Sequence, residues 1–364
     1  MIIDKIKMSM SRFLIVSIIL ASTLLAGVSG CRSGNKQQKD TTDSEMKSAS
    51  IQQNEEDLLA GTYRAVCYSG FRSGQHPDRG DGAVLPSDEE ILEDLKIISE
   101  DSLFNLIRLY DSQENSASVL RVIKEHNLPV KVMLGIWLKA ELSNHEGCAW
   151  LNEPIPQEVL EQNRQDNQEE IQRGINLANQ YPDIVAAVNV GNEALVDWND
   201  HLVETDSVIA YCQKVKEAIN QPVTVAENYE WWAAHGEKLA NELDFIAIHI
   251  YPVWEGKDID EGLSYSIENV QKVRDALPNS TIVISEAGWA SEGSEFGERA
   301  SEDKQLRYYN ELMAWADKMN ITTFFFEAFD EDWKGDPNNP LGAEKHWGLF
   351  NIDRSPKKVM TQNN

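Results

Sequence analysis

The sequence predicts an α/β fold, a single (β/α)8 barrel, from three observations. Eight short apolar runs alternate along the chain with amphipathic stretches. The runs are rich in Val, Ile, Phe and Tyr and are nearly continuous, which is typical of strands buried on both faces of a parallel sheet. The chain has 364 residues, enough for a barrel of roughly 250 residues with insertions. A doubly wound open sheet is the alternative arrangement of the same elements.

The apolar runs set the predicted strands, and the stretches between them set the predicted helices. Strands are predicted at residues 63–69, 104–110, 130–138, 185–190, 223–226, 245–251, 282–285 and 323–326. A first helix begins after Ser87, because Ser is a good N-cap and acidic residues follow it. Further helices are predicted at about 118–126, 156–180, 203–219, 233–241, 264–276 and 302–318.

The N-terminal residues 1–30 are predicted to be a lipoprotein signal peptide. Lys5, Lys7 and Arg12 precede an apolar run at 13–25, followed by small residues, which is the pattern of a secretory signal. Residues 28–31, Val-Ser-Gly-Cys, resemble a bacterial lipobox, in which Cys31 is lipidated. An ordinary signal peptide is the alternative. Arg rather than Asp at position 32 favours the outer membrane, so we expect an exported, lipid-anchored protein.

Residues 31–57 are predicted to be a disordered tether, because they are polar and almost free of apolar residues. The catalytic domain is then expected at 58–364. No internal repeat and no second linker is visible, so the chain is predicted to carry one barrel domain. We expect a monomer.

Charge and cysteine content exclude several classes of function. The formal net charge is −27, which argues against a nucleic-acid partner. Three cysteines follow Cys31, namely Cys67, Cys148 and Cys212. They form no Cys-x-x-Cys motif, so we expect buried structural cysteines, with one disulfide possible but unassigned. No phosphate loop or zinc motif is present, and we expect neither a cofactor nor a metal.

Two glutamates follow predicted strands, where barrel enzymes carry their catalytic groups. The fourth strand leads into Glu193 and the seventh into Glu286. Glycosidic bond cleavage needs such a pair, one carboxyl group protonated to assist the leaving oxygen and one ionised to attack the anomeric carbon. The alternative for either residue alone is a solvated or salt-bridged side chain at a strand end.

These motifs resemble those of the family 17 glycoside hydrolases, which are β-1,3-glucanases. The likeness covers about residues 58–357. It is carried by Val66-Cys67-Tyr68, Ile107-Arg108-Leu109-Tyr110-Asp111, Val190-Gly191-Asn192-Glu193, Ile250-Tyr251-Pro252, Ser285-Glu286-Ala287-Gly288-Trp289, Phe329-Asp330-Glu331-Asp332-Trp333-Lys334 and Glu344-Lys345-His346-Trp347-Gly348-Leu349-Phe350.

The resemblance implies a role for each matched residue. Glu193 would be the general acid/base and Glu286 the nucleophile of a retaining double displacement. Asn192 would bond the sugar 2-hydroxyl, Tyr251 would orient the nucleophile, and Tyr68 would line the subsite of the distorted sugar. The full substrate-binding set that we expect is Tyr68, Arg108, Asn192, Tyr251, Trp289, Glu331, Trp333, Lys334 and Glu344.

Three further residues and one loop bear on the site. Glu227 and Glu327, at the ends of the fifth and eighth strands, are read as supporting acids or sugar ligands, and His249 as a structural histidine. Trp289 and Trp333 have core packing as an alternative to sugar contact. The segment 139–157 looks like an added loop on the catalytic face, and such a loop would restrict one end of a substrate groove.

The sequence therefore predicts a retaining glycoside hydrolase, an endo-β-1,3-glucanase of the laminarinase type, with β-glucan polysaccharide or oligosaccharide as its partner. A transglycosylase or an exo-acting glucosidase is the alternative with the same chemistry. A glycan-binding surface lipoprotein without catalysis is the alternative from another class. A cell-wall-remodelling lipoprotein that acts on the host's own glucan would share the chemistry but differ in role.

Overall fold

The computed structural model describes residues 51–362, except 55–58, 60, 62, 79–81 and 101–102. All of the described residues belong to one compact unit, Glu45–Asn364. The predicted signal peptide, Cys31 and most of the predicted tether lie outside the described residues.

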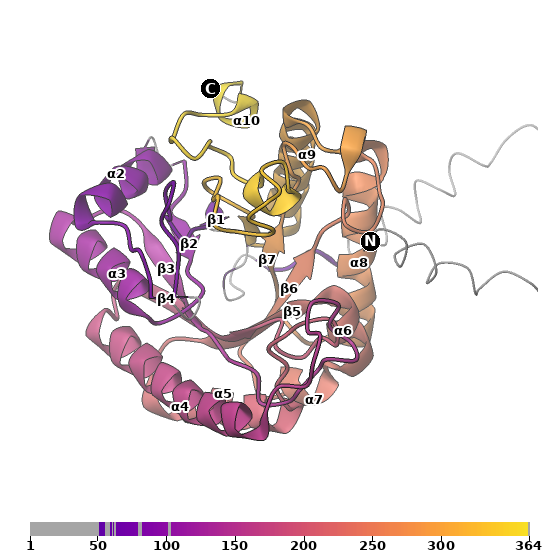
Figure 1. The fold of residues 1–364 in the computed structure, drawn as a ribbon. Coiled ribbons are helices and arrows are strands. Elements are labelled where there is room, and N and C mark those ends of the chain that lie inside the picture. The colour runs from indigo at the N-terminus through magenta and orange to yellow at the C-terminus, as the bar shows by residue number, and fades with distance from the viewer. Residues whose placement is uncertain are drawn as a thin grey trace, which may run out of the picture. The chain divides into compact units, whose positions relative to one another are not determined.

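Eight parallel strands close into a barrel in chain order, with helices around it (Figure 1). The ring closes where β1 pairs with β8, Ala65 opposite Phe324 and Val66 opposite Phe325. The predicted (β/α)8 barrel is therefore confirmed, and each strand falls in or overlaps its predicted run. The strands are β1 (Ala65–Cys67), β2 (Leu106–Arg108), β3 (Lys131–Ile136), β4 (Val185–Asn192), β5 (Val223–Asn228), β6 (Ile246–Ile250), β7 (Ile282–Ala287) and β8 (Thr323–Phe325).

The helices lie close to their predicted positions, and their ends follow local capping chemistry. Ser87 caps the first one through a capping box with Glu90, and Ser301 caps α9. The predicted helix at 264–276 begins earlier, because Asp258 provides a cap. The helices are α2 (Asp88–Ser99), α3 (Glu114–His126), α4 (Gln157–Gln180), α5 (Thr205–Ala218), α6 (Tyr229–His235), α7 (Glu237–Ala240), α8 (Ile259–Ala276), α9 (Glu302–Met319) and α10 (Lys358–Thr361).

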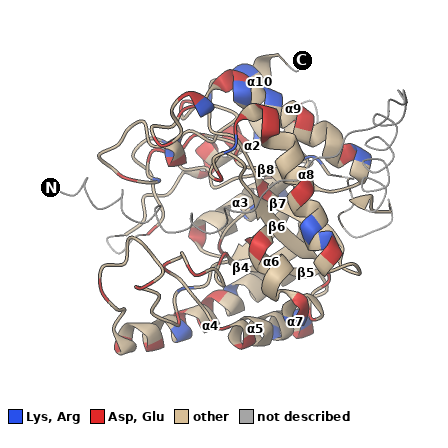
Figure 2. Ribbon diagram, turned by 90° about the vertical axis from the view of Figure 1, so that its right-hand side faces the viewer, with Lys and Arg blue, Asp and Glu red and all other residues tan. Residues whose placement is uncertain are grey.

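Charged residues occupy the outer helices and loops, as Figure 2 shows. Among the described residues, no helix combines the length and the apolar character needed to cross a bilayer. Cys67, Cys148 and Cys212 are buried and free, as expected for structural cysteines.

The fold reaches further toward the N-terminus than the composition predicts. Ile51 and Gln53 fall in the predicted tether, yet they are 0% and 5% exposed. The Gln53 side chain accepts from the Ile282 backbone N–H at 2.6 Å and donates to its carbonyl at 3.0 Å. These contacts pair polar groups at the amino end of β7. For these two residues the tether prediction was wrong, because a polar side chain can be buried when its hydrogen bonds are met.

The buried carboxylate of Asp94, on α2, joins the loop after β1 to the C-terminal segment of the chain. Asp94 is fully buried and accepts hydrogen bonds from Arg354 Nε and Nη2 at 2.8 and 2.7 Å, and from Arg72 Nη2 at 2.8 Å. Tyr68 Oη lies 3.3 Å from the same carboxylate. Burial raises the pKa of Asp94 despite the two arginines, so loss of hydration outweighs their attraction.

We expect Asp94→Ala to lower the free energy of unfolding by about 3–5 kcal/mol, because it leaves Arg354 buried without its anion. The matched control is Glu93→Ala, which removes a second partner of Arg72 that is 58% exposed. This change should cost less than about 1 kcal/mol. Chemical denaturation followed by tryptophan fluorescence measures both values, and equal losses would contradict the structural role given to Asp94.

Candidate active site

The carboxyl ends of the parallel strands bring Glu193 and Glu286 to one rim of the barrel. Glu286 lies within β7, and Glu193 follows the last residue of β4 directly. The chain turns sharply at Glu193, whose φ is +49°. The side chain of Glu286 is 9% exposed and that of Glu193 is 22% exposed. Both are thus partly open to a ligand, Glu193 more so.

Three donors surround the carboxylate of Glu286. Oε1 accepts from Arg108 Nη1 at 2.6 Å and from Tyr110 Oη at 3.0 Å. Oε2 accepts from Tyr251 Oη at 2.7 Å. The donors come from β2, from the residues after it and from the end of β6, so three segments fix both oxygens of one carboxylate.

This environment lowers the pKa of Glu286. Burial alone would raise the pKa, but the nearby His249 ring, the charge of Arg108 and the hydroxyl groups of Tyr251 and Tyr110 outweigh burial. A carboxylate that stays ionised and is held by fixed donors is suited to nucleophilic attack on an electrophilic carbon.

Glu193 has a different environment. Its Oε1 lies 2.9 Å from Nδ1 of His249, and His249 is itself fully buried on β6. The other ring nitrogen, Nε2, lies 3.6 Å from Glu286 Oε1 and 3.2 Å from Arg108 Nη1. One imidazole therefore stands between the two carboxyl groups, while Glu193 keeps the more open position that a proton donor needs.

The sequence pattern predicts a structural role for His249 and no site role for Tyr110. The structure places both beside the glutamates. A signal for His249 was present, because residues two apart on a strand share a face, and Tyr251 was already assigned to the site. Tyr110 follows β2 two residues after Arg108, and the same spacing argument applies to it.

Arg108 also orients the asparagine beside the acid. Its Nη2 donates to Asn192 Oδ1 at 2.5 Å, and its Nη1 lies 3.1 Å from the Ser285 carbonyl. Arg108 is fully buried, so its fork fixes groups on β4 and β7 rather than meeting solvent. Bonded in this way, the Asn192 amide is oriented next to Glu193.

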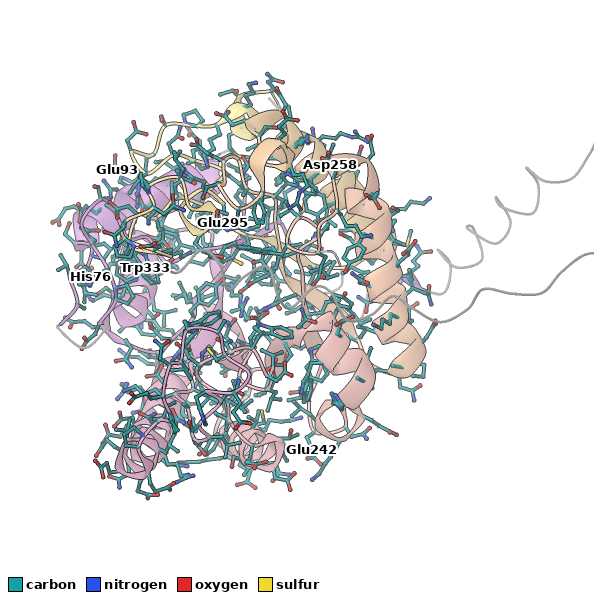
Figure 3. The ribbon with its side chains drawn as sticks, turned by 45° about the vertical axis from the view of Figure 1, so that its right-hand side comes forward. His76, Glu93, Glu242, Asp258, Glu295 and Trp333 are labelled. Atoms are coloured by element: carbon teal, nitrogen blue, oxygen red, sulfur yellow. The ribbon has the colours of Figure 1, made fainter. Side chains whose placement is uncertain are left out.

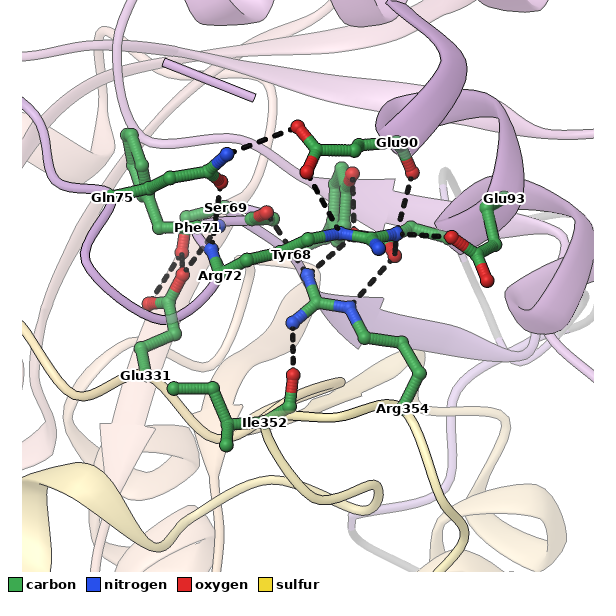
Figure 4. Close-up of polar contacts among 12 residues, drawn as sticks. Tyr68, Ser69, Phe71, Arg72, Gln75, Glu90, Glu93, Glu331, Ile352 and Arg354 are labelled. Atoms are coloured by element: carbon green, nitrogen blue, oxygen red, sulfur yellow. Dashed lines mark hydrogen bonds and ion pairs between the residues drawn. The ribbon is translucent and has the colours of Figure 1, made fainter. Parts of the chain in front are cut away.

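A second charged cluster follows β8. Lys334 Nζ lies 2.5 Å from Glu327 Oε2 and 2.9 Å from Glu331 Oε2. Glu331 also accepts from Ser69 Oγ at 2.7 Å and from the Phe71 N–H at 3.0 Å, contacts visible in Figure 4. The cluster therefore ties the segment after β8 to the loop after β1.

The charges of both Glu286 and Glu193 affect the pKa of Glu344. Burial raises its pKa, and the charges of Glu286, Glu295 and Glu193 act in the same direction, while Lys334 opposes them. Of the residues predicted to bind substrate, Arg108 and Tyr251 thus contact Glu286, and Asn192 is bonded to Arg108 beside Glu193.

Three predicted substrate-binding residues have other surroundings. Tyr68 is 1% exposed, with its hydroxyl on Asp94. Trp289 is fully buried, and its Nε1 donates to the Arg299 carbonyl at 2.8 Å. Trp333 is half-buried with its ring 5.7 Å from that of Phe71 (Figure 3). Core packing, the alternative weighed for Trp289, describes its surroundings here.

Among the described residues, no group of three or more His, Cys, Asp or Glu side chains is arranged to hold a metal ion. The site is built from carboxyl groups, hydroxyl groups and cations of the protein itself.

A (β/α)8 barrel that carries two carboxyl groups in unlike environments at its catalytic rim meets the requirements for glycosidic bond cleavage. Family comparison agrees. The model of the BtgE/BtgC glycoside hydrolase domain matches residues 65–348, and the chain belongs to this family. The predicted resemblance to glycoside hydrolases of the β-1,3-glucanase type is likewise confirmed by this match and by the curated relatives.

Curated relatives are fungal proteins named for action on 1,3-β-glucan. A glucan 1,3-beta-glucosidase of Schizosaccharomyces pombe is 31% identical over 188 residues, 48% of this chain and 57% of that protein. One from Arthroderma benhamiae is 26% identical over 69% of this chain and 78% of its own length. The putative endo-1,3-beta-glucosidase btgC of Aspergillus niger is 27% identical over 75% of this chain, which spans 40% of that protein.

Two solved structures of proteins named for action on β-1,3-glucans have a similar fold. An endo-laminarinase from Formosa Hel1_33_131 matches with a TM-score of 0.72 and 26% identity, over 85% of this chain and 88% of that one. A β-1,3-glucanosyltransferase from Rhizomucor miehei matches with a TM-score of 0.62 and 22% identity, over 82% and 97% of the two chains. The second match shows the shared fold.

As the pH is lowered, the Tyr251→Phe variant should lose activity at a higher pH than the wild type does. If Glu286 is the attacking carboxylate, it must be ionised, so activity is lost as the pH falls through its pKa, and the Tyr251 hydroxyl helps to keep that pKa low. We expect the acidic limb of the pH profile of kcat/KM to move to higher pH. The loss of a hydrogen bond to a charged group should also reduce kcat/KM at its optimum by about 10- to 100-fold.

The matched control is Tyr308→Phe, because the buried Tyr308 hydroxyl is hydrogen-bonded to Ser266 in the helix layer. This variant should keep the wild-type profile. An unmoved acidic limb in Tyr251→Phe would contradict the assignment of Tyr251 as a donor that stabilises ionised Glu286.

Proposed function

We propose that this protein is a retaining β-1,3-glucanase in which Glu286 is the nucleophile and Glu193 the general acid/base. One observation carries the proposal, which is the contrast between the two carboxyl groups. Glu286 is held by a guanidinium and two hydroxyl groups that favour its charge, whereas Glu193 is more exposed and contacts an imidazole. Such a pair can divide the roles of base and acid.

The reaction follows from these positions. A carboxylate oxygen of Glu286 attacks the anomeric carbon, while Glu193 gives its proton to the departing glycosidic oxygen. The covalent glycosyl ester on Glu286 is then cleaved by water, which passes a proton back to Glu193. Two inversions at one carbon retain the β configuration. Arg108, Tyr110 and Tyr251 hold Glu286 throughout, so little reorganisation is needed when its charge is lost and regained.

The substrate class rests on the relatives. The curated relatives are named for glucan 1,3-β-glucosidase or endo-1,3-β-glucosidase activity, and the Formosa structure is named an endo-laminarinase. These names support β-linked glucose chains of the laminarin type as the substrate of this chain, with internal cleavage as the preferred mode.

One feature favours chain-end action as the second candidate. The segment between β3 and α4, which contains the predicted added loop 139–157, is bonded to the loop after β4. Glu141 N–H donates to the Leu202 carbonyl at 2.9 Å, and Trp150 Nε1 donates to Asp200 Oδ2 at 3.1 Å. Because the second loop starts at Glu193, the joined loops stand beside the acid and would restrict a long chain there.

We expect the purified full-length chain to release oligosaccharides from laminarin, and Glu286→Gln to lower kcat by several orders of magnitude, since glutamine cannot form the glycosyl ester. The control Glu298→Gln changes an exposed glutamate on η3 (Gly297–Arg299) and should retain full activity. Reducing-end assays give the rates, and chromatography gives the product sizes.

The products distinguish the alternatives. A ladder of sizes at early times indicates internal cleavage, one small product indicates chain-end action, and products longer than the donor indicate transfer. Binding of laminarin without any product would contradict the enzymatic proposal and favour a glycan-binding lipoprotein.

We further propose that the chain is an exported lipoprotein anchored through Cys31, in the outer membrane. The support is the order of basic residues, apolar run and lipobox-like Val28–Cys31. Two or more acyl chains are needed for stable attachment to a bilayer.

Wild-type protein expressed in a bacterium should incorporate an alkyne-labelled fatty acid and fractionate with membranes, and Cys31→Ser should do neither. Cys148→Ser, a change at a buried cysteine of the barrel domain, is the matched control and should still be labelled. Labelling that persists in Cys31→Ser would overturn the proposal.

A further inference from the structure

Glu227 is a buried carboxyl group that the proposed reaction does not use. It lies on β5 and is fully buried. Its Oε1 accepts the backbone N–H of Leu195 at 2.9 Å, and the N–H of Ala194 also stabilises its charge. Within the part of the chain that the structure describes, Oε2 has no hydrogen-bond partner.

The two N–H groups belong to the turn that carries Glu193. This turn departs from regular strand geometry, with φ values of +87° at Gly191 and +49° at Glu193. A non-glycine residue in the left-handed region is uncommon and persists where its surroundings hold it. The pairing of β4 with β5 is irregular between Asn189 and Asn192, so the ladder itself holds the turn only in part.

Side chains supply the remaining support on both sides of the turn. Asn199 Nδ2 donates to the Glu193 carbonyl at 3.1 Å, and His201 Nε2 donates to the Asn192 carbonyl at 2.8 Å. On the donor side, the Glu193 N–H reaches the Ala226 carbonyl at 2.8 Å. Glu227 accepts the Leu195 N–H, two residues further along the chain, so it adds to the fixation of the backbone on which Glu193 stands.

A carboxyl group in this position carries an energetic penalty. Burial raises the pKa of Glu227 well above its ordinary value, and the charge of Glu193 acts in the same direction. A buried oxygen without a partner adds to the energetic penalty. Groups kept at such a penalty next to a reactive site are candidates for a functional role.

We propose that Glu227 is a positioning residue for the general acid, and that its carboxyl group holds the turn 193–195 so that Glu193 is directed at the leaving-group oxygen. Glu227 does not contact the substrate in this role. The inference rests on the proposed function of Glu193 as the proton donor.

The test compares two substrates that share one sugar part. These are the phenyl and the 2,4-dinitrophenyl β-glycosides of a β-1,3-linked glucose disaccharide. Phenol needs a proton as it leaves, whereas dinitrophenolate leaves without one, so a misplaced acid slows only the phenyl substrate. The variants are Glu227→Met, which removes the acceptor, Glu227→Asp, which withdraws it by one methylene, and Glu227→Gln, which keeps an acceptor oxygen.

We expect Glu227→Met and Glu227→Asp to lower kcat/KM about 100-fold for the phenyl glycoside and less than about threefold for the dinitrophenyl glycoside. Glu227→Gln should remain within about threefold of the wild type on both, since its amide oxygen can accept the Leu195 N–H. Thr224→Val is the matched control, because it removes another buried hydrogen bond from β5, to the Phe245 carbonyl. It should show no leaving-group selectivity.

Equal losses on both substrates, or no loss on the phenyl glycoside, would overturn the positioning role. If Glu227→Met does not fold, Glu227→Asp decides by the same criterion. Glu193→Ala separates the two proposals: it should show the selective loss more strongly. If Glu193→Ala shows no selectivity, the proposed role of Glu193 fails, whereas selectivity in Glu193→Ala without selectivity in the Glu227 variants removes only the inference about Glu227.

Discussion

The catalytic end of this barrel depends on the buried guanidinium of Arg108. A carboxyl group that is largely withdrawn from water tends to take up a proton, and a positive charge nearby opposes this tendency at Glu286. Arg108 provides that charge and, through its planar fork, also binds Asn192 and the Ser285 carbonyl. The cation therefore fixes β4, which leads into Glu193, and β7, which carries Glu286, relative to each other, as bidentate arginines can.

Other charges on the same face stabilise loops in comparable ways. Asp94 joins the loop after β1 to the C-terminal segment, and Lys334 joins the segment after β8 to the loop after β1. Each ion pair is costly to bury, yet its loss would leave a single unpaired charge. The rim thus gains its rigidity from a few polar centres, while the apolar strands below supply the general stability of the barrel.

Sequence patterns predicted the barrel and both glutamates, because buried strands are readable as apolar runs and catalytic groups follow them. They could not assign His249, since one histidine on a buried strand fits a core as well as a site. Matched motifs also did not determine side-chain direction. Trp289 adjoins the nucleophile motif but packs in the core. Ile51 lies in a polar stretch whose composition hides its contact with the barrel.

Gln53 contacts the start of β7 and Asn320, beyond the end of α9. These contacts make the two ends of the barrel different. The polypeptide enters the barrel at the amino ends of the strands, whereas Glu193 and Glu286 open at the opposite rim. Anything joined to the chain ahead of residue 51 therefore starts from the back of the enzyme.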